Sequence, residues 1–164
     1  MIPIDVANQQ TALAIDRRQL RRAVRRVLGD EAIAQGRISL AIVDDPTIRR
    51  LNRQYLDHDE PTDVLSFTLE RSADTLEGEV IASAETARRA ARRYGWSPAD
   101  ELLLYVIHGT LHLTGQRDDT PATRALMRAR ERHYLAYFGL ARPCRKHRGP
   151  GPQAASRRSP SRRC

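Results

Sequence analysis

Hydrophobic positions along the chain recur with two spacings, one typical of strands and one typical of helices. Four short segments that alternate or run apolar predict strands, at residues 2–7, 37–43, 64–68 and 79–83. Longer segments with apolar residues at helical spacing predict five helices, at residues 16–28, 45–55 and 84–94, from residue 98 onward, and at 120–138. This order of elements permits a single α+β domain in which helices cover one small sheet.

The helix predicted from Pro98 carries two histidines four residues apart. Residues at this spacing lie on the same face, about 6 Å apart along the axis, so the imidazoles of His108 and His112 can bind one ion. Gly115 can adopt the left-handed conformation that ends a helix and turns the chain back. The turn would bring Asp118 to the same ion. The pattern H-x-x-x-H-x-x-G-x-x-D therefore predicts a metal site with the ligands His108, His112 and Asp118.

The ligand types favour a catalytic ion. Three protein ligands and an open fourth position are typical of catalytic zinc, whereas structural zinc is usually closed by four ligands rich in cysteine. The motif contains no cysteine. The helix is apolar on most of its surface, so the histidines lie on or beside a buried element, where a polar ring must be paired or coordinated.

The sequence leaves three roles open for Asp119, the carboxylate that follows the motif. Metalloproteases carry a glutamate after the first histidine as general base, and Gly109 occupies that position here, which disfavours peptidase chemistry. We expect His108 and Asp119 to be catalytic, with Asp119 as a base. Asp119 could instead replace Asp118 as third ligand, or it could only stabilise the start of the next helix, which Thr120 caps.

Three blocks of sequence resemble the YbeY family of bacterial endoribonucleases, which act in ribosomal RNA maturation. HGTLHLTGQRD at residues 108–118 is similar to the family signature HGxLHLxGYDH. LNRQY at 51–55 and PTDVLSF at 61–67 resemble the family's LNxxYR and PTDVLSFP, and GEVI at 78–81 resembles its GDIVI. The blocks follow one another in the family's order.

The resemblance implies a small mixed four-stranded sheet covered by about five helices. It also implies a metal-dependent, single-strand-specific endoribonuclease of late 16S rRNA processing and ribosome quality control. Such an enzyme would hold one Zn²⁺ per chain and meet ribosomal RNA on the 30S side of the ribosome, as a monomer in the cytoplasm. Two alternatives remain: a metal-dependent hydrolase of another substrate, since fold and site do not fix substrate, or a non-catalytic ribosome-assembly factor with a structural metal.

The chain departs from the family pattern at two functional positions. Asp118 stands where the family has its third histidine. An oxygen ligand is acceptable to zinc but shifts the preference toward harder ions, so another transition metal is a second candidate. The arginine that follows the LNxxY tyrosine, thought to hold RNA phosphate, is Leu56 here, and Arg53 is the candidate substrate-binding substitute. We also expect at least one of Asp63 and Ser66 to face the metal cleft, with a turn cap formed by Thr62 and Asp63 as the alternative.

Charge divides the chain into two parts. The sequence has 164 residues and a formal net charge of +8, and residues 142–164 hold eight Lys and Arg and no acid. Residues 1–141 are therefore formally neutral and are predicted to form the endoribonuclease-like domain. Rich in Pro, Ser and Gly, residues 142–164 are predicted to be a disordered tail that binds RNA phosphates or is simply solvated. The arginine-rich face of residues 17–26 could also contact RNA, although a solvated helix face is the simpler reading.

No segment of the sequence predicts membrane insertion. There is no run of eighteen or more apolar residues, and the first residues lack a basic region followed by an apolar stretch. We therefore expect a soluble, cytoplasmic protein without a membrane partner.

Overall fold

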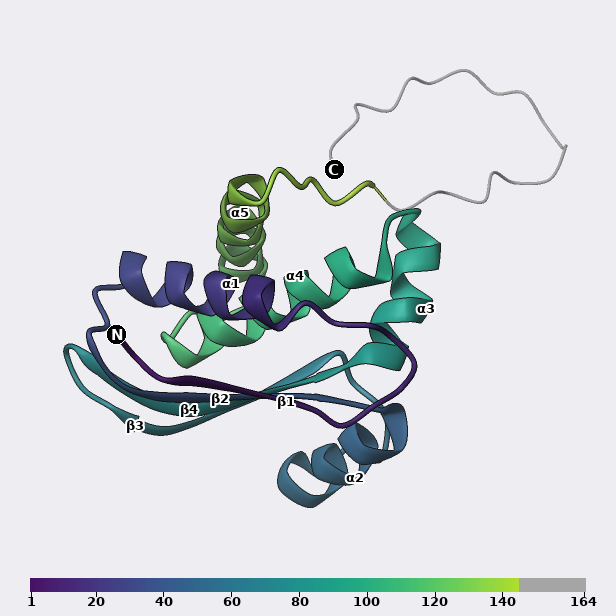
Figure 1. The fold of residues 1–164 in the computed structure, drawn as a ribbon, viewed down its shortest axis with the longest axis horizontal. Coiled ribbons are helices and arrows are strands. Elements are labelled where there is room, and N and C mark those ends of the chain that lie inside the picture. Colours follow the sequence, from purple (N-terminus) through teal and green to yellow (C-terminus); the bar gives the residue numbers. More distant parts are fainter. Residues whose placement is uncertain (145–164) are drawn as a thin grey trace, which may run out of the picture.

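A computed structural model describes residues 1–144, which form one four-stranded mixed sheet with five helices (Figure 1). The strands are β1 (Ile4–Asn8), β2 (Gln35–Val43), β3 (Val64–Arg71) and β4 (Thr75–Ser83). The helices are α1 (Arg17–Asp30), α2 (Asp45–Leu56), α3 (Ala84–Tyr94), α4 (Pro98–Leu113) and α5 (Pro121–Tyr137). The predicted α+β class, with a small mixed sheet covered by helices, is confirmed. No helix within residues 1–144 has the length and apolar character needed to cross a bilayer.

The strands lie in the order β1-β2-β4-β3. β1 and β4 both pair in parallel with β2, and β3 pairs antiparallel with β4 at the edge of the sheet. β3 and β4 form a hairpin and extend beyond the predicted ranges of 64–68 and 79–83. The added residues include Glu70 and Glu77, which are exposed and pair across the two strands. Hydrophobic alternation does not predict a strand at these exposed positions, but hydrogen bonding between the two backbones extends the strands through them.

Short polar side chains set where the helices begin. A side-chain oxygen accepts a hydrogen bond from a backbone N–H in the first turn of every helix, which satisfies one of the donors that the helix leaves unpaired. These N-cap residues are Asp16, Asp44, Ser83, Ser97 and Thr120. The start of α4 at Pro98 and the Thr120 cap of α5 agree with the sequence predictions.

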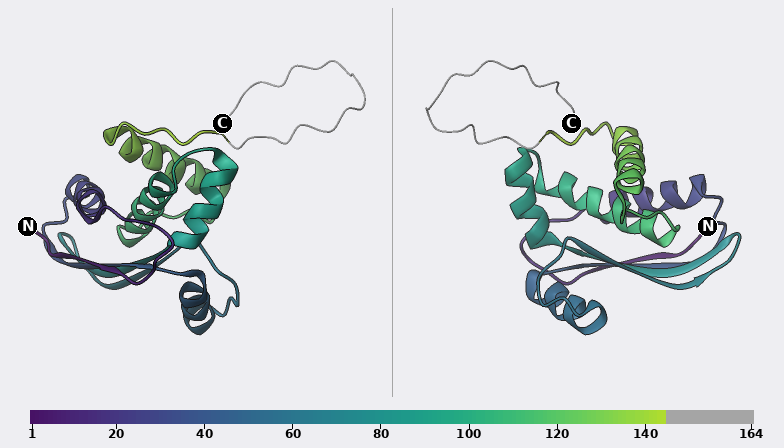
Figure 2. Two further views of the ribbon diagram at one scale, coloured as in Figure 1. Left: turned by 45° about the vertical axis from the view of Figure 1, so that its right-hand side comes forward. Right: turned by 180° about the vertical axis from the view of Figure 1, so that it is seen from behind.

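Helix α4 is the centre of the fold. It lies across one face of the sheet and packs against α1, α3 and α5 as well as β3 and β4 (Figures 1 and 2). Most of its residues are buried, and the main core includes Leu103, Ile107 and Leu111 together with Ile38 and Leu40 of β2. Burial on several sides explains why the helix is apolar around most of its circumference.

Helix α2 lies on the opposite face of the sheet from α4 (Figures 1 and 2). It closes a smaller core of Val43, Ile48 and Leu65, against which Phe67 is partly buried. The rings of Phe67 and the exposed Tyr55 are in contact, with centroids 5.3 Å apart. Most of α2 therefore lies on the other side of the sheet from α4, whereas Asp45 at its start accepts hydrogen bonds from Ser83 and Thr86 at the beginning of α3.

Helix α4 approaches the sheet most closely at Gly109. A Cβ atom there would lie 2.7 Å from Cγ1 of Val80 and 2.8 Å from Cγ2 of Val64. The Ser66 hydroxyl of β3 donates a hydrogen bond of 2.8 Å to the Gly109 carbonyl. The position that holds a glutamate in metalloproteases thus lies against β3 and β4, in a space that admits no side chain.

Replacing Gly109 with alanine is expected to lower the free energy of unfolding by about 1–3 kcal/mol, the usual effect of overpacking. Denaturant titration measures this change. Gly29→Ala in α1 is the matched control, because a Cβ at Gly29 meets nothing within 4 Å. Equal stability of the two variants would show that α4 can move away from the sheet without loss.

Candidate metal centre

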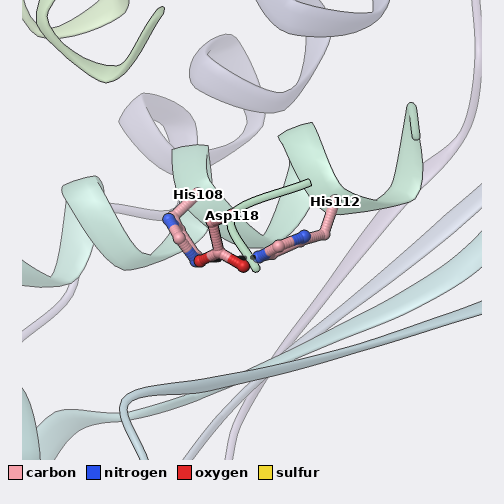
Figure 3. Close-up of side chains that lie close together, drawn as sticks. All are labelled: His108, His112 and Asp118. Atoms are coloured by element: carbon pink, nitrogen blue, oxygen red, sulfur yellow. Dashed lines mark hydrogen bonds and ion pairs between the residues drawn. The ribbon is translucent and has the colours of Figure 1, made fainter. Parts of the chain in front are cut away.

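Two histidines and one aspartate meet beside α4 (Figure 3). The Nε2 atoms of His108 and His112 are 2.9 Å apart. Oδ2 of Asp118 lies 3.4 Å from Nε2 of His108 and 3.5 Å from Nε2 of His112. One ligand atom from each residue thus falls within 4.8 Å of the others, and this is the one such group of three found among residues 1–144. We call these three residues the triad.

The turn after α4 brings Asp118 to the histidines. Gly115 has a φ of +92°, in the left-handed region that favours glycine. Its N–H donates to the carbonyl of His112 at 2.9 Å, and the N–H of Gln116 donates to the carbonyl of Leu111 at 3.0 Å. These bonds satisfy carbonyls at the end of the helix and reverse the chain. The glycine therefore performs the turn expected from the sequence.

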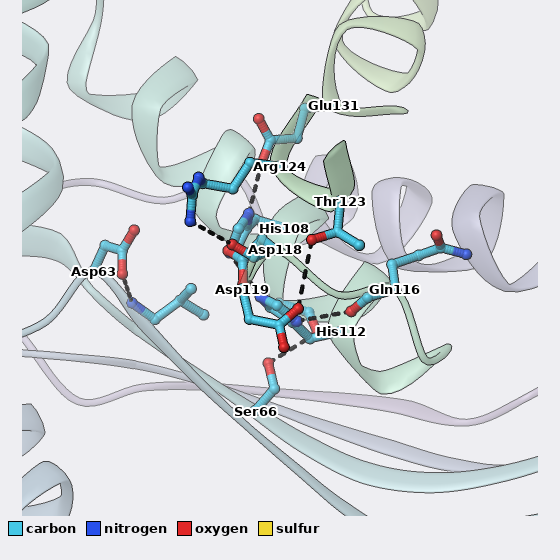
Figure 4. A network of polar contacts seen from close by, with 12 residues as sticks. Asp63, Ser66, His108, His112, Gln116, Asp118, Asp119, Thr123, Arg124 and Glu131 are labelled. Carbon is cyan, nitrogen blue, oxygen red and sulfur yellow. Dashed lines mark hydrogen bonds and ion pairs between the residues drawn. The ribbon is translucent and has the colours of Figure 1, made fainter. Parts of the chain in front are cut away.

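The second nitrogen of each histidine ring has its own acceptor. Nδ1 of His112 donates to the backbone carbonyl of Gln116 at 2.9 Å, and Nδ1 of His108 lies 2.5 Å from Oε1 of Glu131 (Figure 4). A carbonyl oxygen can only accept, so His112 carries a hydrogen on Nδ1, and in the neutral ring this leaves the lone pair of Nε2 to bind a metal. Oxygen acceptors of this kind orient histidine ligands in metal sites.

Sequence reasoning missed Glu131. It lies on α5, 23 residues from His108, and no local spacing connects the two. Glu131 stands out in the sequence only as a carboxylate on a helix rich in arginine. The sequence does not show which face of α5 packs against α4, so it does not connect Glu131 with His108.

The donor set fits a divalent transition-metal ion. Tetrahedral zinc with ligand distances of about 2.0–2.1 Å places its ligand atoms about 3.4 Å from one another, close to the separations between Asp118 and the two histidines. Burial alone would lower the pKa of His108. The hydrogen bond and charge of Glu131, with the charges of Asp63 and Asp118, outweigh burial and raise that pKa. The ring therefore lies in negative surroundings that favour a cation.

Asp119 lies outside the triad. Its exposed carboxylate forms an ion pair with Arg117 and lies 3.5 Å from Oγ1 of Thr123 (Figure 4). The hydrogen bond from Arg117 is the main cause that lowers the pKa of Asp119. A carboxylate held in its ionised form is a weak base at neutral pH, and the catalytic role expected of Asp119 stays a prediction. Asp118 is the aspartate that the structure brings to the histidines.

Asp63 and Ser66 have different surroundings. Asp63, directly before β3, lines the same pocket as His108 and Asp118, as expected for at least one of these two residues. It also accepts hydrogen bonds from Thr62 Oγ1 and from the backbone N–H of Val64, so it caps the turn as well. Ser66 is engaged with the backbone of α4 instead.

A pocket of about 330 Å³ opens beside the triad. Its polar lining comes from α4, α5, the turn between them and the segments before β3 and after α5. It includes Asp63, His108, Asp118, Arg124, Arg128, Glu131 and Arg142. Arg53, the predicted substrate-binding residue, lines a separate pocket on α2 with Arg49 and Asp59. Arg53 and the triad are therefore not brought into one pocket, and its predicted role stays a prediction.

Arg142 is bound to the folded domain, although it was predicted to be the first residue of the tail. Its Nε donates to Glu101 at 3.2 Å, and its guanidinium lies 3.5 Å from the ring centroid of Tyr94. The Glu101 side chain is fully buried and also accepts a 2.6 Å hydrogen bond from Nε1 of Trp96. Arg142 thus pairs with a buried carboxylate of the folded domain, a contact that the composition could not reveal, and the boundary at 141/142 stays a prediction. Residues 145–164 of the predicted tail lie outside the described residues.

The protein is a small α+β domain with two histidines and one aspartate clustered beside its central helix. These features place it in the class of candidate metal-binding proteins. A family model described as "Endoribonuclease YbeY" matches residues 5–139. The chain belongs to this family, which confirms the resemblance seen in the sequence.

Individual relatives agree with this family. The chain is 42% identical over 125 residues to "Endoribonuclease YbeY" of Rhodopirellula baltica, covering 75% of this chain and 64% of that protein. It is 41% identical over 153 residues to the protein of the same name from Moorella thermoacetica, covering 84% of this chain and 97% of that protein. A solution structure of a Thermotoga maritima protein has the same fold, with a TM-score of 0.55 and 22% identity over 83% of this chain and 91% of that one.

Proposed function

We propose that this protein is a metal-dependent, single-strand-specific endoribonuclease that acts in late 16S rRNA processing and ribosome quality control. Relatives across the matched length carry the name endoribonuclease. The observation that carries the proposal is the triad, in which two histidine Nε2 atoms and one carboxylate oxygen converge while Glu131 and Gln116 hold the other ring nitrogens.

His108, His112 and Asp118 would hold one ion, for which zinc is the first candidate and another transition metal the second. A bound ion of this kind polarises a phosphate and acidifies water or a hydroxyl group. The residues of the chain prepare the site for it. Glu131 and the Gln116 carbonyl orient the two rings, and the carboxylate of Asp118 completes the donor set.

The partners follow from the same proposal. The substrate would be ribosomal RNA, which the protein would bind on the 30S side of the ribosome. The protein would act as a monomer in the cytoplasm. The supporting observation is family membership over residues 5–139.

A nuclease assay tests the function. Zinc-loaded protein should cut single-stranded RNA and leave duplex RNA intact, and His112→Ala should abolish the cut. RNA binding without cleavage would favour an assembly factor with a structural metal. Metal binding without any effect on RNA would favour a hydrolase of another substrate.

Asp118→Ala is expected to weaken metal binding far more than Asp119→Ala, because Asp118 alone of the two faces both histidines. Removing one ligand of three should lower affinity by more than about 100-fold, beyond the roughly 10–100-fold lost with a supporting partner. Competition with a chromogenic chelator measures the affinities. Asp118→His, which restores the family's residue, should retain the metal, and a larger loss in Asp119→Ala would reverse the assignment.

The basic C-terminal segment gives a separate prediction. Residues 145–164 contain seven Lys and Arg and no acid, and deleting them spares Arg142. RNA affinity should fall, together with the slope of log affinity against log salt, which scales at about 0.7 per phosphate neutralised on a single strand. An unchanged slope would locate the phosphate contacts on the folded domain instead, with the arginines of α1 as the next candidates.

A further inference from the structure

Three arginines line the triad pocket, and they differ in how far their charges are already neutralised. Arg142 is committed to the buried Glu101 and to the ring of Tyr94. Arg124 makes one long contact of 3.4 Å to the backbone carbonyl of Asp118. Arg128 is exposed and has no hydrogen-bond or ion-pair partner within residues 1–144. Arg124 and Arg128 therefore present two guanidinium groups without a carboxylate partner to the pocket.

The position of these arginines is fixed by the contact between α5 and the triad. Arg124, Arg128 and Glu131 are spaced by four and three residues along α5, so they share one face of the helix. Glu131 contacts Nδ1 of His108 at 2.5 Å, which holds this face against the triad. The guanidinium of Arg124 lies beside Asp118 in the same view (Figure 4).

The charge of the pocket makes anion binding dependent on the metal. Its acidic residues are Asp63, Glu101, Asp118 and Glu131, and its basic residues are Arg124, Arg128 and Arg142. Without an ion the acidic residues outnumber the arginines by one, whereas a divalent cation on the triad would give an excess of one positive charge. An anion is therefore favoured once the metal is bound, and the two unpaired guanidinium groups offer the planar donors that suit phosphate oxygens.

We propose that Arg124 and Arg128 of α5 bind the phosphates of single-stranded RNA next to the metal ion. This assignment rests on the proposed endoribonuclease function. The chain has Leu56 where the YbeY pattern has arginine, and Arg53 lines a pocket on the other face of the sheet. The assignment therefore supplies the cations that the site needs to bind phosphate. Arg124 and Arg128 take this role because they line one pocket with His108 and Asp118 of the triad.

Equilibrium binding tests the assignment without requiring turnover. The probe is a short fluorescein-labelled single-stranded DNA, which presents the same phosphates without a 2′-hydroxyl group, titrated with zinc-loaded protein and followed by fluorescence anisotropy. Arg124→Ala and Arg128→Ala should each weaken binding about five- to tenfold, as expected for loss of a charge-assisted contact. The double variant should lower the slope of log affinity against log salt by about 1.4, or about 0.7 for each phosphate contact. Arg128→Lys should recover part of the lost affinity.

Arg132→Ala is the matched control. Arg132 lies one turn further along α5, is exposed, and does not line the pocket. Its removal should change affinity less than twofold, and all variants should keep the wild-type metal content by elemental analysis. The assignment is overturned if Arg132→Ala weakens binding as much as Arg128→Ala, if the double variant binds normally, or if the arginine variants lose the metal.

The two proposals fail in different ways. A wild-type protein that binds metal and oligonucleotide but leaves single-stranded RNA uncut would contradict the endoribonuclease function. The binding series would still show whether Arg124 and Arg128 hold phosphates. A wild-type protein that cuts RNA, with arginine variants that bind as the control does, would contradict the phosphate assignment alone.

Discussion

Replacing His112 with alanine is expected to remove the bound metal and to abolish RNA cleavage while leaving the fold intact. The His112 ring is partly exposed, so its loss leaves no large cavity in the core. It supplies one of only three protein donors, and its Nδ1 is already held by the carbonyl of Gln116. Metal affinity should fall by more than about 100-fold, since removing an orienting partner alone lowers it about 10–100-fold.

His133→Ala is the matched control for this experiment. His133 lies on α5 and is exposed, and its nearest carboxylate is that of Asp30 at 3.8 Å. Its removal should leave metal content and cleavage unchanged. Metal affinity is measured by chelator competition, cleavage by a gel assay, and folding by circular dichroism. A His112→Ala protein that keeps its metal and its activity would show that the triad is not the site.

Replacing Arg142 with alanine is expected to cause the largest loss of stability among the surface arginines, about 3–5 kcal/mol in the free energy of unfolding. The Glu101 carboxylate is fully buried, and a buried charge that loses its partner is strongly destabilising. The hydrogen bond from Trp96 would remain, but it supplies no compensating charge. Denaturant titration measures the change, which is expected even though Arg142 lies beyond the last helix.

The companion variant separates lost charge pairing from lost packing. If the unpaired carboxylate is the cause, Glu101→Gln combined with Arg142→Ala should lose less stability than Arg142→Ala alone. Arg132→Ala, on the exposed surface of α5, should change stability by no more than about 0.5 kcal/mol. A loss below 1 kcal/mol in Arg142→Ala would mean that the segment after α5 is not anchored through Glu101.

The sequence predicted those parts of the molecule that depend on short spacing. The triad spans eleven residues, and helix geometry with one glycine turn is sufficient to bring His108, His112 and Asp118 together. The helices were also predicted close to their observed ends, because caps and apolar periodicity are local. The strands β3 and β4 were predicted too short, because pairing between backbones extends them through exposed polar residues.

The partners that complete the site could not be predicted in the same way. Glu131 meets His108 across 23 residues, and Arg142 meets Glu101 across 41. Both contacts depend on how α5 and the segment after it pack on α4. The sequence around Glu131 and Arg142 does not indicate which residues of α4 they will contact. Gly109 was read as a missing general base, whereas the structure reveals a steric requirement for close packing on the sheet.

The metal content of the purified, tag-free protein tests the central claim most directly, because every proposed role depends on an ion at the triad. Elemental analysis should find about one transition-metal ion per chain, with zinc expected, and a strong chelator should remove it and lower the melting temperature. Protein that contains no metal after incubation with zinc, and whose melting temperature is unchanged by the chelator, would contradict the account.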